Sequence, residues 1–249
     1  MEILTGTSGY SYKEWKGNFY PPSIKPGDML AYYAERLKCV EINNTFYRMP
    51  TEKTVSEWAG QVPDDFVFVI KASRRITHNK RLHNVESEIS FLLGQLSVLG
   101  QKLGALLFQL PPNLKRDLDR LKEFLGVLPD TVPAAIEFRN SSWFEDEVYE
   151  LLRGRNIALV KSDTTEASGS TLIDTGDIGY LRLRREEYSD VDLRNWARRI
   201  GDQEWSRTFV FFKHEDGGAG PRLAARLSVL AQEVRSKPGN PTVPLELDS

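Results

Sequence analysis

The chain is predicted to form a (β/α)8, TIM-barrel-like single domain, and three observations support this fold class. Eight apolar, strand-like segments punctuate the sequence. Segments with helical periodicity lie between most of them, at roughly 30 residues per unit, as in βαβ units. The length of 249 residues matches one α/β barrel. Because periodicity does not show that a sheet closes, an open doubly wound sheet is the alternative architecture.

The expected strands are short runs rich in β-branched and aromatic residues. In chain order they cover 2–7, 39–43, 66–71, 104–109, 134–139, 157–161, 179–184 and 208–213. Most of them end in a charged or amide residue, such as Lys71, Gln109 or Lys213. Parallel barrels carry their chemistry at the carboxyl ends of the strands, so this pattern predicts where a site lies.

The expected helices are the amphipathic segments between these strands. They cover 28–38, 52–60, 84–101, 115–127, 144–154, 190–200 and 221–235. The first begins at a capping-type residue, Asp28, and ends on the basic Lys38, as helices commonly do. The segment 162–177 lacks a convincing amphipathic pattern, so we expect one barrel helix to be shortened or missing there.

The domain is expected to span 1–235, followed by a flexible or extended C-terminal tail over 236–249. This tail contains Pro238, Pro241 and Pro244. With 40% hydrophobic residues the chain can bury a substantial core without disulfides.

Composition and charge exclude several classes of protein. The formal net charge of −2 does not indicate a general polyanion binder. No apolar run reaches membrane-spanning length, and no signal peptide is apparent, so we expect a cytoplasmic protein without a membrane partner. The sequence does not predict an oligomeric state.

The metal-ligating residue types are sparse. Cys39 is the single cysteine, which excludes an intramolecular disulfide and a multi-cysteine zinc site. The three histidines form no H-x-x-x-H pattern, which argues against a multi-zinc site. A Mg²⁺ site built from Glu41, Glu137 and Asp163 is the alternative, because this ion prefers oxygen ligands.

Alternation along the strands separates barrel-interior positions from helix-facing ones. It directs Glu41, Asn43, Glu137 and Arg139 inward, and likewise Tyr180, Arg182 and Arg184. We place Lys71, Gln109, Lys161, Asp163 and Lys213 at or near the upper rim. The charged members give this mouth a net charge of about +3, which would suit an anionic ligand. The alternative is an interior ion-pair network that binds nothing.

The segment 71–83 is rich in basic residues. It contains Lys71, Arg74, Arg75, His78, Lys80, Arg81 and His83, and no acidic residue. A loop at this position lies at the catalytic end of a barrel, where arginines could hold a phosphate in a bidentate manner. The alternative is a solvated basic loop.

Aromatic residues follow several of the same strands. They are Tyr10, Tyr12, Trp15, Phe19, Tyr20, Phe46, Tyr47, Trp143 and Phe144. Aromatic rings stack on bases or sugars, and basic groups among them would follow a phosphate backbone. The alternative is a hydrophobic lid packed on the barrel rim.

These patterns give a set of candidate site residues. The candidate catalytic residues are Glu41, Glu137 and Lys71. The candidate ligand-binding residues are Tyr10, Trp15, Asn43, Arg74, Arg75, His78, Gln109, Arg139, Trp143, Asp163, Arg182, Arg184 and Lys213. Nearby cations should depress the pKa of both glutamates, which disfavours a general acid. A Schiff-base lysine, Lys71 or Lys161, is a further chemistry that we considered.

Several short motifs resemble the YecE-like family, also called domain of unknown function 72. They are Gly6-Thr7-Ser8-Gly9-Tyr10-Ser11-Tyr12 with Trp15, Glu41-Ile42-Asn43-Asn44-Thr45-Phe46-Tyr47, Lys71-Ala72-Ser73-Arg74-Arg75-Ile76-Thr77-His78, Gln109-Leu110-Pro111-Pro112, and Glu137-Phe138-Arg139 with Trp143. They occur in family order over most of the chain. The resemblance implies a TIM-barrel-like fold without an established reaction. A likeness of some members to endonuclease IV-type barrels suggests nucleic-acid binding by analogy only.

The sequence thus favours an enzyme that acts on a phosphate-bearing ligand at the C-terminal mouth of a barrel. The alternative is a non-catalytic nucleic-acid-binding module that uses the 71–83 loop and the rim aromatics.

Overall fold

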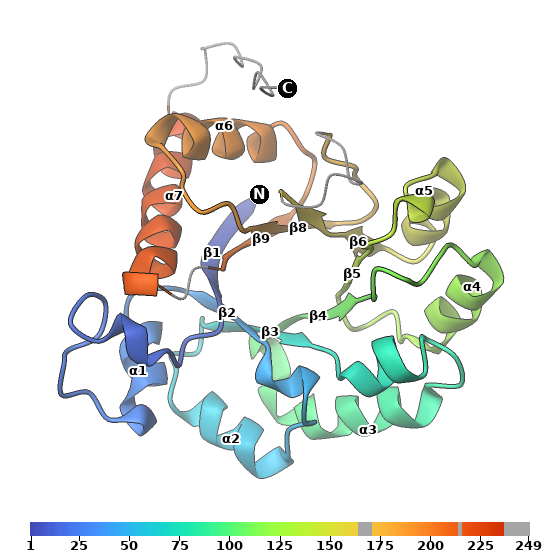
Figure 1. The fold of residues 1–249 in the computed structure, drawn as a ribbon, viewed down its shortest axis with the longest axis horizontal. Coiled ribbons are helices and arrows are strands. Elements are labelled where there is room, and N and C mark those ends of the chain that lie inside the picture. The colour runs from blue at the N-terminus through green and yellow to red at the C-terminus, as the bar shows by residue number, and fades with distance from the viewer. Residues whose placement is uncertain (164–170, 214–215, 237–249) are drawn as a thin grey trace.

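The computed structural model of the protein describes residues 1–163, 171–213 and 216–236. A parallel sheet forms a ring at the centre, and the helices lie around its outside (Figure 1). Within the described residues the strands are β1 (Glu2–Ser8), β2 (Cys39–Ile42), β3 (Val67–Lys71), β4 (Leu103–Gln109), β5 (Ala134–Glu137), β6 (Ile157–Leu159), β7 (Lys161–Ser162), β8 (Ile178–Leu183) and β9 (Arg207–Phe212).

The sheet is nearly closed, because its two ends are consecutive pieces of chain. The strand order is β6-β5-β4-β3-β2-β1-β9-β8-β7, and the pairs whose register is given are parallel. Only Val160 separates β6, which pairs with β5, from β7, which pairs with β8. The expected strand 157–161 is therefore split into two short strands, each of which pairs with a different neighbouring strand. This arrangement confirms a TIM-barrel-like fold rather than an open doubly wound sheet.

The helices of the described chain follow the expected order. They are α1 (Met29–Ala34), α2 (Glu52–Gly60), α3 (Glu86–Leu96), α4 (Leu118–Val127), α5 (Asp146–Arg153), α6 (Asp190–Gly201) and α7 (Ala219–Ser236). Several are shorter than the sequence pattern suggests. For example, α4 begins at Leu118 because the Asp117 side chain accepts the Arg120 N–H and caps the helix.

Two expectations fall partly outside the described residues. Between β7 and β8, residues 163 and 171–177 contain no helix, as the pattern of 162–177 predicted; 164–170 lie outside the described residues. Helix α7 ends at Ser236, and 237–249, the greater part of the expected tail, also lie outside them.

Two apolar clusters lie on opposite sides of the barrel wall. The outer cluster joins the helices to strand residues such as Val40, Ile42 and Phe108. The inner cluster fills the barrel with alternate residues, such as Leu4, Val69 and Leu107, with Phe209 and Phe211. This division follows the alternation expected of barrel strands. Large side chains therefore fill the interior as a packed core.

Strands β1 and β2 approach closely at Gly6. A Cβ atom at this position would lie 2.1 Å from the Cys39 carbonyl oxygen. Gly6 is the register partner of Cys39, and two residues further on Ser8 is the partner of Glu41. The absence of a side chain at Gly6 thus allows the contact that positions the upper ends of both strands.

Candidate active site at the barrel mouth

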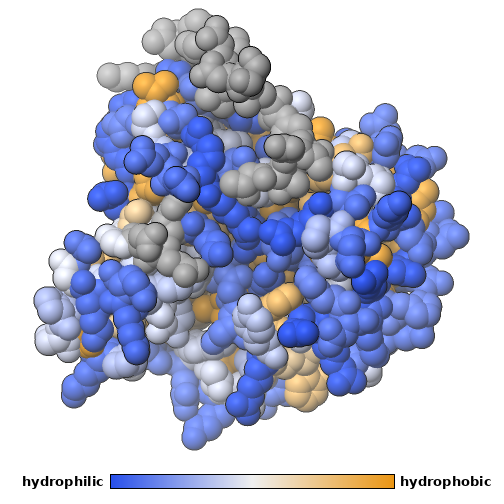
Figure 2. All heavy atoms as spheres, in the orientation of Figure 1, coloured by the Kyte–Doolittle hydropathy of each residue, from blue (hydrophilic) through white to orange (hydrophobic). Residues whose placement is uncertain are grey.

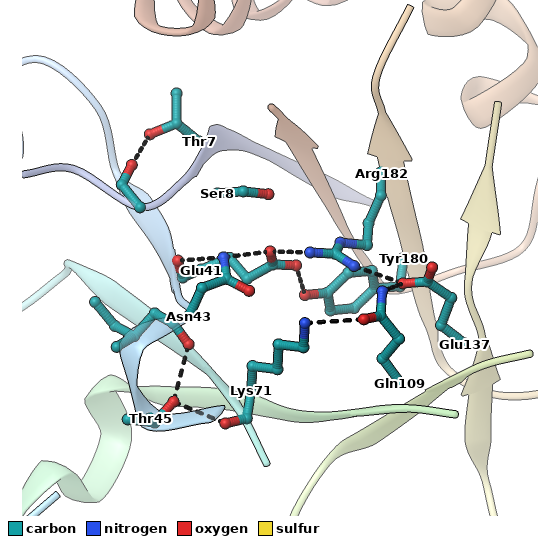
Figure 3. A network of polar contacts seen from close by, with 12 residues as sticks. Thr7, Ser8, Glu41, Asn43, Thr45, Lys71, Gln109, Glu137, Tyr180 and Arg182 are labelled. Atoms are coloured by element: carbon teal, nitrogen blue, oxygen red, sulfur yellow. Dashed lines mark hydrogen bonds and ion pairs between the residues drawn. The ribbon is translucent and has the colours of Figure 1, made fainter. Parts of the chain in front are cut away.

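A polar layer lies above the apolar barrel interior, at the carboxyl ends of the strands. Alternation brings polar side chains to the inner side of five strands there. We define the mouth network as Glu41, Asn43, Lys71, Gln109, Glu137, Tyr180 and Arg182 (Figure 3). Its members come from β2, β3, β4, β5 and β8 and the loop after β2. Figure 2, drawn in the orientation of Figure 1, shows that this face of the molecule is mostly hydrophilic.

Arg182 joins the two carboxylates of the network. Its Nη2 donates to Glu41 Oε1 at 2.6 Å, and its Nη1 donates to Glu137 Oε2 at 2.6 Å. The three side chains are at most 2% exposed. The guanidinium therefore occupies the space between two carboxylates that would otherwise be buried without compensation.

Further donors complete the environment of each carboxylate. Tyr180 OH donates to Glu41 Oε2 at 2.6 Å, and Asn43 Nδ2 donates to Glu41 Oε1 at 2.9 Å. Burial alone would raise the pKa of Glu41, but Arg182 and these hydrogen bonds outweigh it and lower the pKa to about 2. The pKa of Glu137 is lowered for the same reason, against the effect of burial. Both glutamates are thus ionised at neutral pH, as expected for acids surrounded by cations.

The two carboxylates differ in one respect. Both oxygens of Glu41 accept hydrogen bonds. Glu137 Oε2 accepts from Arg182 and from Gln109 Nε2 at 2.8 Å, whereas Glu137 Oε1 is buried without a hydrogen bond from the described residues. Arg139 Nε lies 3.5 Å from this atom. Glu137 Oε1 is therefore the carboxylate oxygen with capacity for a further proton donor.

Lys71 lies at the edge of the network. Its Nζ donates to Gln109 Oε1 at 2.9 Å and lies 4.3 Å from the centre of the Phe46 ring (Figure 3 shows the Gln109 contact). Lys71 is 9% exposed. Burial, assisted by the charge of Arg182, lowers the pKa of Lys71 to about 8, although Glu41 and Glu137 oppose the change.

Two arginine nitrogens at the mouth lack an acceptor. Arg182 Nε and Arg184 Nε are buried and have no hydrogen-bond partner within the described chain. Burial lowers the pKa of Arg184, and its next largest influence is the charge of Arg182. Ser8 Oγ, at the inner side of β1, is also buried without a partner there. Every second residue of β1 faces the barrel interior, beginning with Leu4 and Gly6, so the sequence alone could have identified Ser8 as an inward-facing residue at the mouth.

Positive charge exceeds negative charge in this region. The two carboxylates, Glu41 and Glu137, contact or electrostatically influence four cations, which are Lys71, Arg139, Arg182 and Arg184. The surplus of two positive charges is smaller than expected, since some predicted members lie elsewhere.

Lys161 and Asp163 interact with residues outside the mouth network. Lys161 pairs in register with Leu181 of the outer cluster, and its pKa is lowered to about 8 by burial and then by Arg199 of α6. Lys161 therefore faces the helix layer, which corrects its placement on the rim. Asp163 accepts the backbone N–H of Arg184 and the hydroxyl of Tyr188. Lys213 is exposed just after β9.

The basic segment 71–83 is partly neutralised. Arg75 Nε and Lys80 Nζ contact the two oxygens of the buried Glu88, at 2.7 Å and 2.8 Å. Arg74 is exposed. His78 packs edge-on against Phe46, and burial, then Lys71 and Arg139, lowers the pKa of His78. The sequence showed this cluster of cations but not that Glu88, on α3, would hold two of them.

The segment also has unusual backbone geometry. Residues Arg75–Asn79 form a π-helical turn. Arg81, Leu82 and Asn84 follow it with φ angles of 51°, 69° and 50°. Left-handed conformations are costly for a residue such as Leu82, so the surrounding contacts must enforce them.

The predicted rim aromatics divide into core and surface residues. Trp15 and Trp143 are 1% and 0% exposed, and Trp143 stacks on Phe138 with Nε1 donating to the Leu114 carbonyl. Neither offers a free ring face in this structure, so they support the hydrophobic-lid interpretation. Tyr10 is partly buried, and Tyr47 is 76% exposed. Tyr47 is the aromatic ring most accessible for stacking among these.

The described residues contain no group of three or more His, Cys, Asp or Glu side chains that could hold a metal ion. Asp163 contacts the start of the loop after β8 rather than the two glutamates, and Arg182 lies between Glu41 and Glu137. These residues do not fit the Mg²⁺ site considered from the sequence. None of the helices in the described ranges is both long and apolar enough to cross a membrane.

The fold and the charged mouth define a parallel α/β-barrel protein with a candidate site at the carboxyl ends of its strands. The family described as "Protein of unknown function DUF72" matches residues 4–246. The chain therefore belongs to the DUF72 family, as its motifs suggested.

Relatives and solved structures agree with this assignment. The UPF0759 protein YecE of Escherichia coli strain K12 is 33% identical over 156 residues, which are 61% of this chain and 54% of YecE. The match thus spans about half the length of YecE. The UPF0759 protein YunF of Bacillus subtilis is 24% identical over 87% of this chain and 90% of its own.

A DUF72 family protein from Thermotoga maritima has a similar structure, with a TM-score of 0.76 and 25% identity over 95% of this chain and 100% of its own. Another, from Enterococcus faecalis, superimposes with a TM-score of 0.71 and 21% identity, covering 95% of this chain and 98% of its own. The latter supports the fold.

Proposed function

We propose that the protein is an enzyme that acts on a phosphate-bearing anion at the barrel mouth. The observation that carries the proposal is the buried Nε of Arg184, which has no acceptor among the described residues. Leaving such a donor unsatisfied costs about 1–3 kcal/mol, and a phosphate oxygen would supply the missing acceptor. The surplus of positive charge around it favours the same kind of ligand.

The proposed roles follow from the contacts of each side chain. Arg184 and Arg139 would hold the anion, while Glu41 holds Arg182 in place. Glu137 would accept a proton through Oε1, the oxygen without a hydrogen bond. The lowered pKa of both glutamates makes them poor general acids at neutral pH. Lys71, with a pKa of about 8, is the residue of the mouth network whose amine changes protonation state in this range.

A non-catalytic nucleic-acid-binding module receives less support. Two cations of the basic segment are paired with Glu88, and Trp15 and Trp143 are buried. Single-stranded nucleic-acid sites need accessible cations and ring faces over several nucleotides. We therefore favour a small phosphate ester over an oligonucleotide.

Thermal-shift measurements with inorganic phosphate, sugar phosphates, nucleotides and a short oligonucleotide test this proposal. A ligand at 100 times its Kd stabilises a protein by about 2.7 kcal/mol. We expect small phosphates to stabilise the wild type and to lose this effect in Arg184→Gln. The matched control is Arg185→Gln, because Arg185 is already paired with Asp192 at 3.0 Å.

The outcomes separate the alternatives. Stabilisation by the oligonucleotide alone would favour nucleic-acid binding. If no compound stabilises a cooperatively melting wild type, the proposal is wrong. For a phosphate ester that is turned over, Glu137→Gln should still bind it but lose turnover, measured by phosphorus NMR.

A further inference from the structure

Lys71 has a different environment from an ordinary ion-paired lysine. It is the last residue of β3, and its amine is placed between the Gln109 amide oxygen at 2.9 Å and the Phe46 ring at 4.3 Å. The described contacts of Nζ include no carboxylate within ion-pair distance. The amine thus lies in the mouth, held by one neutral acceptor and one ring face.

We propose that Lys71 forms an imine with an aldehyde or ketone that carries a phosphate group. The phosphate part of this inference rests on the function proposed above, with Arg184 and Arg139 as its binding residues. The carbonyl part rests on the position and surroundings of the Lys71 amine and does not depend on the phosphate site.

The reaction needs no oxidant or reductant. The lone pair of the neutral amine adds to the carbonyl carbon, the oxygen takes up a proton and the nitrogen loses one, which gives a neutral carbinolamine. The hydroxyl group then takes up a proton and leaves as water, and the nitrogen lone pair forms the C=N bond of a protonated imine, which gives the neutral imine when it loses its remaining N–H proton. In this proposal Glu137 takes up and returns these protons, because its Oε1 lies in the same network and accepts no hydrogen bond from the described residues.

The electrostatic environment supports this chemistry. A lysine becomes nucleophilic when burial or a neighbouring cation lowers its pKa. Burial and Arg182 have this effect on Lys71, whose pKa of about 8 leaves a substantial neutral fraction at pH 8. A bound phosphate beside Arg184 would bring the carbonyl group close to the amine.

Lys161 provides a comparison within the same barrel. Its pKa is also lowered to about 8, and it is 8% exposed. However, Lys161 faces the helix layer near Arg199 rather than the mouth. Although its pKa is lowered, Lys161 should not form an imine with a carbonyl compound that is bound at the barrel mouth.

The test uses the full chain with glycolaldehyde phosphate or glycolaldehyde, followed by borohydride reduction and peptide mapping by mass spectrometry. We expect glycolaldehyde phosphate to modify Lys71 at least about tenfold faster than Lys161 or the surface lysines. Saturating inorganic phosphate should protect Lys71, and its labelling should increase as the pH rises through about 8. Lys71→Arg should remove the modification, and Lys161→Arg should retain it.

The outcomes distinguish the two parts of the proposal. Equal labelling of Lys71 by both aldehydes, without protection by phosphate, would support the imine and contradict the phosphate site. Thermal stabilisation by phosphate without labelling of Lys71 would refute the imine and leave the proposed function standing. Labelling of Lys161 as fast as Lys71 would show that the barrel mouth gives Lys71 no preference, and it would refute the proposed selective imine at Lys71. Because the decisive measurement uses the wild type, it does not depend on the folding of any variant.

Discussion

Replacing Arg182 by Met removes the cation between two buried carboxylates and leaves a chain of similar length. In the wild type, a pKa of Glu41 lowered from 4.5 to about 2 corresponds to about 3 kcal/mol of stabilisation of its charged form. Removing one partner of a buried ion pair typically costs about 3–5 kcal/mol. We therefore expect Arg182→Met to lose at least about 3 kcal/mol at pH 7. This is a large part of the roughly 5–15 kcal/mol by which domains are stable.

The stability of the wild type and the stability of Arg182→Met should change with pH in opposite directions. In the wild type, Glu41 and Glu137 have lowered folded-state pKa values, so their stabilising effect is present above pH 4.5 and is lost as the pH falls from 4.5 towards 2. Without Arg182, burial dominates and raises both pKa values above those of the unfolded chain. The variant should therefore lose stability as the pH rises from 4.5 to 7, where the wild type changes little on account of these groups.

Urea denaturation followed by circular dichroism at several pH values between 4.5 and 7 measures both quantities. The control is the triple variant Glu41→Gln, Glu137→Gln and Arg182→Met, which has no buried charge at these positions and should recover much of the loss at pH 7. A loss below about 1 kcal/mol in Arg182→Met, with the pH profile of the wild type, would refute the reasoning.

Two further predictions concern the elements that support the mouth. Gly6→Ala should destabilise the protein by about 1–3 kcal/mol or more in the same denaturation assay, because a Cβ would lie 2.1 Å from a carbonyl oxygen of β2. Gly27→Ala, with no atom within 4 Å of its Cβ, should have little effect; equal losses would count against the close-approach argument. Glu88→Gln should accelerate amide hydrogen exchange in 75–83, because two cations of this segment lose their anchor. The exposed Glu86→Gln is the control, and unchanged exchange in Glu88→Gln would show that the anchor is not needed.

Alternation along single strands predicted much of the network correctly. Glu41, Glu137 and Arg182 were expected to point inward, and they do so because Val40, Ile136 and Leu181 pack on the helix side. Local periodicity suffices here, since each strand has one apolar set that must face the helices.

The sequence was less informative where contacts depend on distant partners. Lys161 was placed at the rim, although Ala158 and Val160 face the interior and the next residue must therefore face outward. The pairing of Glu88 with Arg75 and Lys80 connects a helix to a loop, and no periodicity indicates it. Likewise, Trp15 and Trp143 follow strands as rim residues would, but the loops fold back and bury them.

The Arg182 bridge also bears on how cooperatively the barrel forms. Arg182 lies 141 residues from Glu41 and 45 from Glu137 along the chain, and the three belong to β8, β2 and β5, which are not neighbours in the sheet. In a partly assembled sheet these charges remain in water, where their attraction is weak. The network therefore stabilises only the assembled ring of strands, and it favours a single transition over a population of half-formed barrels. Contacts of such long sequence separation also make slow folding the expectation for this chain.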